Sequence, residues 1–181
     1  MTRDQAYSLV KPRFSNKNLF KHVLAVEAVM RELAVHFDQD VETWGLTGLL
    51  HDMDYEETAK TPEKHTLVTE ALLKQHDIPQ DIIHAIKCHN HKAERKSLMD
   101  RALYAADPVT GLIVAATLMH PDKKLASVTT DFVLRRYKEK SFDRGASREQ
   151  IQTCQDFGLS LNDFLTISLS GMQKISDDLG L

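Results

Sequence analysis

Residues 48–52 read Gly48-Leu49-Leu50-His51-Asp52, an aliphatic run that ends in a histidine and a carboxylate side by side. The leucines predict a helical segment in the core, where a polar side chain is costly unless it has a partner. Imidazole and carboxylate groups are both ligands for divalent ions such as zinc, iron and manganese. The stretch therefore predicts that two metal ligands enter the core together.

Four further side chains of the same two kinds lie on apolar, helical stripes elsewhere in the chain: His22, His65, His89 and Asp107. His22 alone is more often a satisfied core histidine than a ligand, and Asp107, directly before Pro108, is equally suited to cap a helix. Six such groups on core-facing stripes are better explained together, because one buried metal site would partner all of them.

Two neighbouring patterns compete with this assignment. His91 points away from the stripe of His89 and groups with His84 and Lys87 on the face expected to be exposed, so His89 is the predicted ligand. A second His-Asp pair, His76-Asp77, closes a predicted helix. A histidine suits a helix C-terminus, so that pair is interpreted as structural.

Helical spacing recurs along the chain, and no segment shows sustained alternation with period two. The sequence predicts one all-α domain of roughly eight helices over residues 1–181, with a motif-bearing core at 16–120 and a helical extension at 121–181. The expected helices span 16–37, 41–51, 62–75, 79–90, two pieces of 97–119 divided at Pro108, 124–140, 147–158 and 162–179, with a turn at 143–145.

Composition indicates a single medium-sized domain: the chain has 181 residues, a net charge of −3, nine histidines and two cysteines. The charge balance gives no reason to expect a nucleic-acid partner. Two cysteines without CxxC spacing suit a reducing compartment. The polar N-terminus has no signal-peptide pattern, and the longest apolar stretch, 111–119, is about half of the roughly 20 residues that span a bilayer. We therefore expect a cytoplasmic protein with no membrane partner; the oligomeric state stays open.

The ordered set His22, His51-Asp52, His65, His89 and Asp107 resembles the HD superfamily of metal-dependent phosphohydrolases, over roughly residues 19–118. The resemblance implies an all-α fold in which one metal is held by His22, His51, Asp52 and Asp107. In the two-metal branch, His65 and His89 join and Asp52 bridges both ions. Residues 50–56 depart from the His-Asp-Ile-Gly form of the best-known subgroup, and the Gly-Tyr-Pro signature of cyclic-dinucleotide phosphodiesterases is missing from the sequence.

The resemblance further implies hydrolysis of a small phosphate ester, with a nucleotide as first choice, by hydroxide attack on phosphorus. One or two divalent ions (Fe, Mn, Zn, Co or Ni) would assist it. Asp52 is the expected catalytic bridge. Asp54 is expected to act as an acceptor behind a ligand or as a proton shuttle, unless it is a solvent carboxylate at a helix end. Lys123 and Lys124, after a helix break, are candidate phosphate donors.

Two other interpretations stay open at this point. Some relatives with this ligand set use a di-iron centre to activate oxygen instead of hydrolysing an ester. The third interpretation is a non-catalytic module that binds a metal or a nucleotide.

Overall fold

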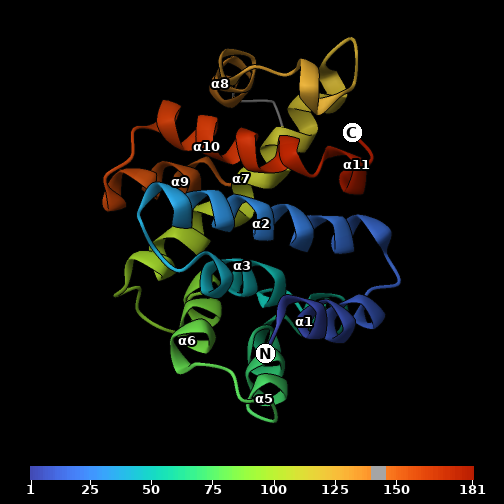
Figure 1. Cartoon of the computed structure of the whole chain (residues 1–181), viewed down its shortest axis with the longest axis vertical. Helices are drawn as coiled ribbons and strands as arrows, with labels where there is room; N and C mark the ends of the chain where they lie inside the picture. Colours follow the sequence, from blue (N-terminus) through green and yellow to red (C-terminus); the bar gives the residue numbers. More distant parts are fainter. Residues whose placement is uncertain (140–145) are drawn as a thin grey trace.

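Helix α2 (Lys17–His36) lies at the centre of the molecule and packs against α3, α7 and α10 (Figure 1). The structure is a computed structural model that describes residues 1–139 and 146–181. Over these residues every regular element is a helix, which confirms the predicted all-α class. The other elements are α1 (Arg3–Val10), η1 (Lys11–Arg13), α3 (Val41–Leu50), α4 (Tyr55–Thr58), η2 (Pro62–Lys64), α5 (Leu67–Leu73), α6 (Gln80–His89), α7 (Leu98–Met119), η3 (Leu125–Ser127), α8 (Thr130–Lys138), α9 (Arg148–Gln152), η4 (Thr153–Phe157), α10 (Leu161–Lys174) and α11 (Ser176–Leu179).

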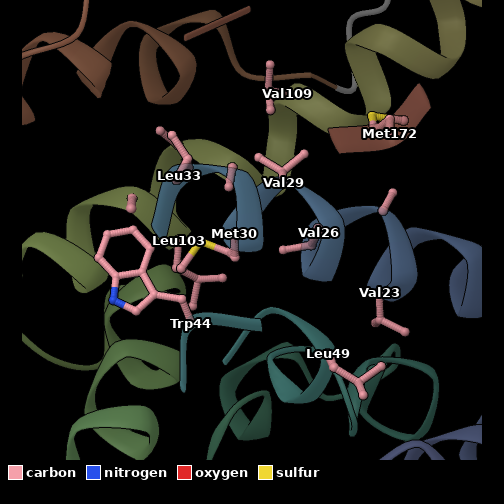
Figure 2. Close-up of a cluster of buried hydrophobic side chains, with 14 of the residues drawn as sticks. Val23, Val26, Val29, Met30, Leu33, Trp44, Leu49, Leu103, Val109 and Met172 are labelled. Atoms are coloured by element: carbon pink, nitrogen blue, oxygen red, sulfur yellow. The ribbon is translucent and has the colours of Figure 1, made fainter. Parts of the chain in front are cut away.

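The apolar stripe of α2 explains its central place. Val26, Met30 and Leu33 follow one another at intervals of three or four residues, and each is fully buried. Met30 lies beside Trp44 of α3 and Leu103 of α7 (Figure 2). Burying each such side chain stabilises the fold by about 1.5–3 kcal/mol. The packing of α2 thereby fixes α3 and α7, the two helices that carry much of the candidate site.

Gly48 is a point of close approach between α3 and α2. A Cβ atom placed on Gly48 would lie 2.8 Å from the backbone nitrogen of Glu27 and 2.8 Å from the carbonyl oxygen of Val26. Real Cβ atoms do not approach backbone so closely, so only glycine fits here without a shift of one helix.

We expect Gly48→Ala to lower the free energy of unfolding by about 1–3 kcal/mol, because the added methyl group overpacks the contact between α2 and α3. The effect opposes helix propensity, which favours alanine over glycine by about 1 kcal/mol. Gly45→Ala in the same helix is the matched control, since the three atoms nearest to its Cβ would all belong to the Arg31 side chain and none to the backbone. Chemical denaturation measures both variants, and equal losses would contradict a tight contact at Gly48.

Helix α7 runs unbroken through Pro108, so the predicted division at this proline was wrong. Proline disfavours the helix interior because it lacks an N–H group and crowds the preceding turn. Burial of Leu103, Val109 and Ile113 on the same helix outweighs that local preference. Asp107 therefore lies inside a helix and does not cap one, which leaves its carboxylate available for the site.

Two other predicted helices are interrupted. The helix expected at 62–75 is divided into η2 and α5 because Thr66 adopts a left-handed backbone with φ 68°. The helix expected at 124–140 is replaced by η3 and by α8, whose N-cap is Thr129. The predicted end at Lys140 and the turn at 143–145 lie outside the described residues.

The remaining differences between the predicted and the observed helices are small and lie near the N-terminus and after residue 146. The short helix expected at 147–158 is present as α9 followed by η4, and the last one as α10 followed by α11. Helix α1 was not predicted, although Thr2 and Gln5 form a capping box that signals its start. Helix α10 packs on α2, so the extension at 121–181 shares the core cluster of the motif-bearing part.

Among the described residues, α7 is the one helix long and apolar enough to cross a membrane by length and composition. Of its apolar window, 61% is buried inside the molecule. The core helix of a folded domain passes the same test, so α7 by itself is weak evidence for a membrane span.

Candidate metal centre

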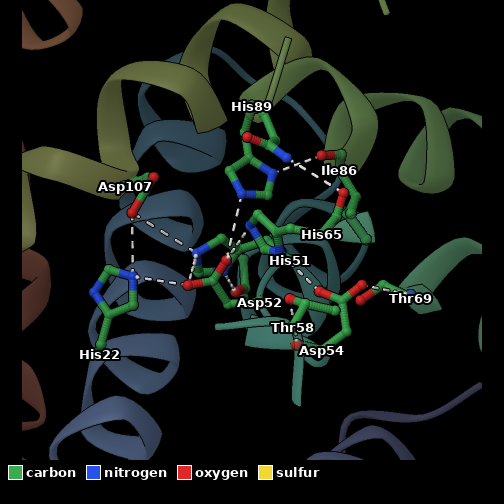
Figure 3. Close-up of polar contacts among 12 residues, drawn as sticks. His22, His51, Asp52, Asp54, Thr58, His65, Thr69, Ile86, His89 and Asp107 are labelled. Carbon is green, nitrogen blue, oxygen red and sulfur yellow. Dashed lines mark hydrogen bonds and ion pairs between the residues drawn. The ribbon is translucent and has the colours of Figure 1, made fainter. Parts of the chain in front are cut away.

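The six predicted ligands converge on one region of the molecule, around a cavity of about 540 Å³ (Figure 3). Five of them line the cavity, and His51 lies fully buried beside them. Their positions come from four helices and two turns: His22 on α2, His51 at the end of α3, Asp52 in the following turn, His65 at the break before α5, His89 at the end of α6 and Asp107 within α7.

Asp52 stands between two groups of histidines. Its Oδ2 atom lies 3.6 Å from Nε2 of His22 and 3.5 Å from Nε2 of His51. Its Oδ1 atom lies 3.3 Å from Nε2 of His65 and 3.3 Å from Nε2 of His89. The two oxygens of one carboxylate therefore face separate pairs of imidazole nitrogens, which is the arrangement a bridging ligand needs.

Asp107 completes the first of these groups. Its Oδ1 atom lies 3.1 Å from Nε2 of His22 and 3.8 Å from Nε2 of His51. His22, His51 and Asp107 thus offer ligand atoms within 4.8 Å of one another, and so do His51, Asp52 and His89. Nitrogen and oxygen ligands at such spacing fit a divalent transition-metal ion.

Backbone carbonyls orient two of the rings. Nδ1 of His51 donates to the carbonyl oxygen of Gly48 at 2.7 Å, and Nδ1 of His89 donates to that of Ile86 at 2.5 Å. A carbonyl can only accept, so Nδ1 carries the proton and the Nε2 lone pair of each neutral ring points to the centre. Both rings are therefore held in the tautomer that binds a metal.

Side chains orient the other two rings. Nδ1 of His65 lies 2.7 Å from Oδ1 of Asp54, and Nδ1 of His22 lies 3.1 Å from Oγ1 of Thr110. In all four histidines Nδ1 is thus engaged away from the centre, and Nε2 is directed into it (Figure 3).

The buried Nε2 atom of His51 shows whether the site suits a metal ion. This atom makes no hydrogen bond with any described residue; the facing oxygens of Asp52 and Asp107 lie 3.5 and 3.8 Å away. A buried polar atom without a partner costs about 1–3 kcal/mol, so such atoms are rare without a reason. A metal ion between His51, Asp52 and Asp107 would supply the partner, and the donor set of imidazoles and carboxylates suits it.

The electrostatics of the cluster favour a cation. Burial disfavours the ionised form of Asp52, but the facing rings of His51, His65 and His89 outweigh this and hold the pKa of Asp52 well below its usual range. Burial likewise opposes charge on His65, but the carboxylates of Asp52 and Asp54 raise the pKa of His65 to about 9. In the metal-free protein the carboxylates are therefore ionised at pH 7, and His65 holds a proton that a metal ion would displace.

We expect metal binding at pH 7 to release at least about one proton per chain, because His65 must be neutral to act as a ligand. Titration of the metal-free protein with Mn²⁺ or Zn²⁺ in weak buffer measures the release, and His65→Gln should release less. The raised pKa also stabilises the metal-free fold below pH 6.5, and this contribution is lost as the pH rises through about 9. Equal proton release from His65→Gln and the wild type would contradict the assignment.

Asp54 is placed behind His65 and does not reach the cavity. Its side chain is fully buried, accepts from the backbone N–H of Thr69 at 2.9 Å, and contacts Nδ1 of His65. The alternative of a solvent carboxylate at a helix end is therefore wrong, and the contact with Nδ1 of His65 is that of an acceptor behind a predicted ligand. Asp54 is a positioning residue that fixes the ring of His65.

We expect Asp54→Asn to weaken metal affinity by about 10- to 100-fold, because a partner behind a ligand ring tunes its basicity and orientation. Asp77→Asn is the matched control, since Asp77 is exposed and lies outside the centre. Isothermal titration with the metal alone measures both affinities. Unchanged affinity in Asp54→Asn would contradict the positioning role.

The two predicted phosphate donors are not brought to the site. Lys123 and Lys124 are exposed in the turn before η3, and neither belongs to the described lining of the cavity. Helix α7 is continuous, so the turn that carries them follows its far end instead of approaching Asp107.

Several lining residues were missed from the sequence. Tyr55, Asn90, His91 and Gln150 line the cavity, and the ring of Tyr55 lies edge-on to that of His65 with centroids 5.4 Å apart. Asn90 and His91 directly follow His89, so proximity to a ligand was the available signal. His91 follows the end of α6 and has a positive φ of 57°.

The part of the chain that carries the candidate site matches a known protein family. The HD domain family matches residues 19–120. Ribonuclease Y of Nitratidesulfovibrio vulgaris (strain DP4) is 28% identical over 96 residues, which cover 53% of this chain and 18% of that protein. Ribonuclease Y of Symbiobacterium thermophilum is 28% identical over 94 residues, 52% of this chain and 18% of that protein. No solved structure matches the chain. The chain belongs to the HD domain family, the superfamily of metal-dependent phosphohydrolases.

Proposed function

We propose that this chain hydrolyses a small phosphate ester, with a nucleotide as the preferred substrate class, at two divalent ions bridged by Asp52. The observation that carries the proposal is the position of Asp52, whose two oxygens each face a separate pair of Nε2 atoms in one cavity. His22, His51 and Asp107 would hold one ion with Oδ2 of Asp52. His65 and His89 would hold the other with Oδ1.

Divalent ions, when bound, provide a hydroxide nucleophile at neutral pH and neutralise charge on the phosphoryl oxygens. The chain contributes the geometry and the charge balance. Asp52 and Asp107 offset only part of the charge of two ions, which leaves a positive centre that attracts an anionic ester. The four imidazole rings are locked by their Nδ1 hydrogen bonds, so little reorganisation is needed when substrate arrives.

The rest of the cavity supports a small substrate. Its volume of about 540 Å³ is within the usual range of pockets for small molecules. Tyr55, Asn90, His91 and Gln150 offer hydrogen-bonding groups and an aromatic face beside the ligands. No lysine or arginine is found in the described lining, so the ions themselves would neutralise most of the phosphate charge.

An RNA substrate is the second candidate, because the chain matches proteins named Ribonuclease Y over about half of its length. The matched segment is 18% of those proteins, so their activity comes to this chain only as a hypothesis. A net charge of −3 and a described cavity lining without lysine or arginine favour the small substrate over a polynucleotide.

The test is a hydrolysis screen with the protein loaded with Mn, Fe, Zn, Co or Ni. Nucleoside mono-, di- and triphosphates, cyclic nucleotides and an RNA oligonucleotide are supplied with air and without it. We expect release of phosphate or of a nucleoside monophosphate from a small nucleotide under both atmospheres. Turnover that requires both iron and oxygen would instead support the di-iron oxygenase. Tight binding without turnover of any substrate would support the binding module.

A further inference from the structure

A second group of metal-binding side chains lies where α6 meets the start of α7. His84 and Cys88 lie one turn apart on α6, and Asp100 lies in the first turn of α7. Their ligand atoms lie within 4.8 Å of one another. The described lining of the central cavity includes none of the three. We propose that His84, Cys88 and Asp100 form a zinc site that clamps α6 to α7.

The spacing of the ligand atoms supports the proposal. Sγ of Cys88 lies 3.5 Å from Nδ1 of His84, which lies 3.2 Å from Oδ2 of Asp100. Bonds to a tetrahedral zinc ion are about 2.0–2.3 Å long, which places neighbouring ligand atoms roughly 3.3–3.7 Å apart. The measured separations are close to this range. Ligands four residues apart on one helix are also a recurring way to hold zinc, because both face the same side.

Burial and access also fit a metal site. Cys88 and Asp100 are 0% and 1% exposed. The backbone N–H groups of Lys96 and Ser97 donate to Oδ2 of Asp100 at 2.9 and 2.8 Å, which holds the carboxylate in place. His84 is half-exposed and, with Asp100, lines a surface depression of about 420 Å³. An ion could enter from this side, where a solvent molecule would complete the coordination.

The chemistry of the three donors selects the ion. Thiolate, imidazole and carboxylate together match zinc, whereas magnesium and calcium prefer oxygen ligands alone. The thiol of Cys88 would lose its proton to solvent on binding, as thiolate ligands do. This donor set differs from that of the central site, whose six ligands include no sulfur.

The position of the group indicates its effect. Cys88 directly precedes His89 on α6, and Asp100 precedes Asp107 by about two turns on α7. A zinc ion here would join the two helices that carry one ligand each of the central site. The role is a structural clamp, and it stands independently of the proposed hydrolysis.

Cobalt(II) substitution tests the site because a cobalt–thiolate bond has a sulfur-to-cobalt charge-transfer band in the near ultraviolet. Histidine and carboxylate ligands give no such band, so the central site is silent in this measurement. We expect the full chain, saturated with Co²⁺ under reducing conditions, to show the band at about one thiolate ligand per chain. Cys88→Ser should abolish it. Cys154→Ser, which removes the other buried cysteine, is the matched control and should keep it.

Absence of the band at saturating cobalt, or its survival in Cys88→Ser, would overturn the proposal. His84→Ala provides a second variant should Cys88→Ser fail to fold by circular dichroism, since the side chain of His84 is 38% exposed and its removal disturbs little packing. We expect His84→Ala to need at least about tenfold more cobalt for half-maximal intensity. An unchanged cobalt titration in folded His84→Ala would equally overturn the proposal.

Discussion

Replacing Asp52 with alanine is expected to remove bound metal from the central site and to lower hydrolysis by more than about 100-fold. Loss of a residue that only supports a ligand costs about 10- to 100-fold in metal affinity or activity. Asp52 faces all four histidines through its two oxygens, so its removal affects both groups at once. The carboxylate also balances charge between the two predicted ions, and without it they would repel one another more strongly. Plasma mass spectrometry of the purified variant measures the metal, and phosphate release measures the activity.

The chain provides its own control for this experiment. His76-Asp77 repeats the His-Asp dipeptide, but both residues are exposed, in the segment between α5 and α6. Asp77→Ala should therefore retain full metal content and full activity. An Asp52→Ala protein that keeps its metal, or an Asp77→Ala protein that loses it, would show that the site has been misassigned.

His89→Ala is expected to lower the metal content by about one ion per chain, while His91→Ala leaves it unchanged. His89 is buried, and its Nε2 atom lies 3.3 Å from Oδ1 of Asp52. His91 lines the cavity but is exposed, and its Nε2 atom lies 3.4 Å from the hydroxyl group of Tyr104. The two variants remove the same side chain two positions apart, so each is the matched control of the other.

Metal analysis of both variants, after loading with the same ion, separates the two histidines. A larger loss in His91→Ala than in His89→Ala would contradict the assignment of the second group. Unchanged metal in both variants would place His89 outside the coordination sphere and leave a site of one ion.

The sequence predicts those features that depend on local pattern. Helix α2 was expected at 16–37 and spans Lys17–His36, because an Asn16 cap and a regular apolar stripe define it. The break at Pro108 was wrong because the local preference of proline is weaker than the burial of α7 against its neighbours. The interruption before α5 was missed because nothing local requires a left-handed backbone at Thr66.

In the candidate site, too, the features set by local sequence pattern could be predicted and those set by tertiary packing could not. Six polar residues on apolar stripes could be found from the sequence, and the structure brings all six together. The sequence could not decide whether Asp54 stands behind a ligand or faces solvent, because its burial depends on the approach of His65 and Thr69, which only the folded chain provides. His84 was expected on an exposed face, and its contact with Asp100 joins two helices, so spacing within one helix could not reveal it.

A centre of two ions bridged by Asp52 can be tested by X-ray diffraction from crystals of the protein loaded with manganese or zinc, recorded at the absorption edge of that metal. We expect two anomalous peaks in the central cavity, one on each side of the Asp52 carboxylate. One peak should lie beside His22, His51 and Asp107, and the other beside His65 and His89. A cavity without a peak, or with a single peak that Asp52 does not contact, would contradict the bridged centre on which the proposed hydrolysis rests.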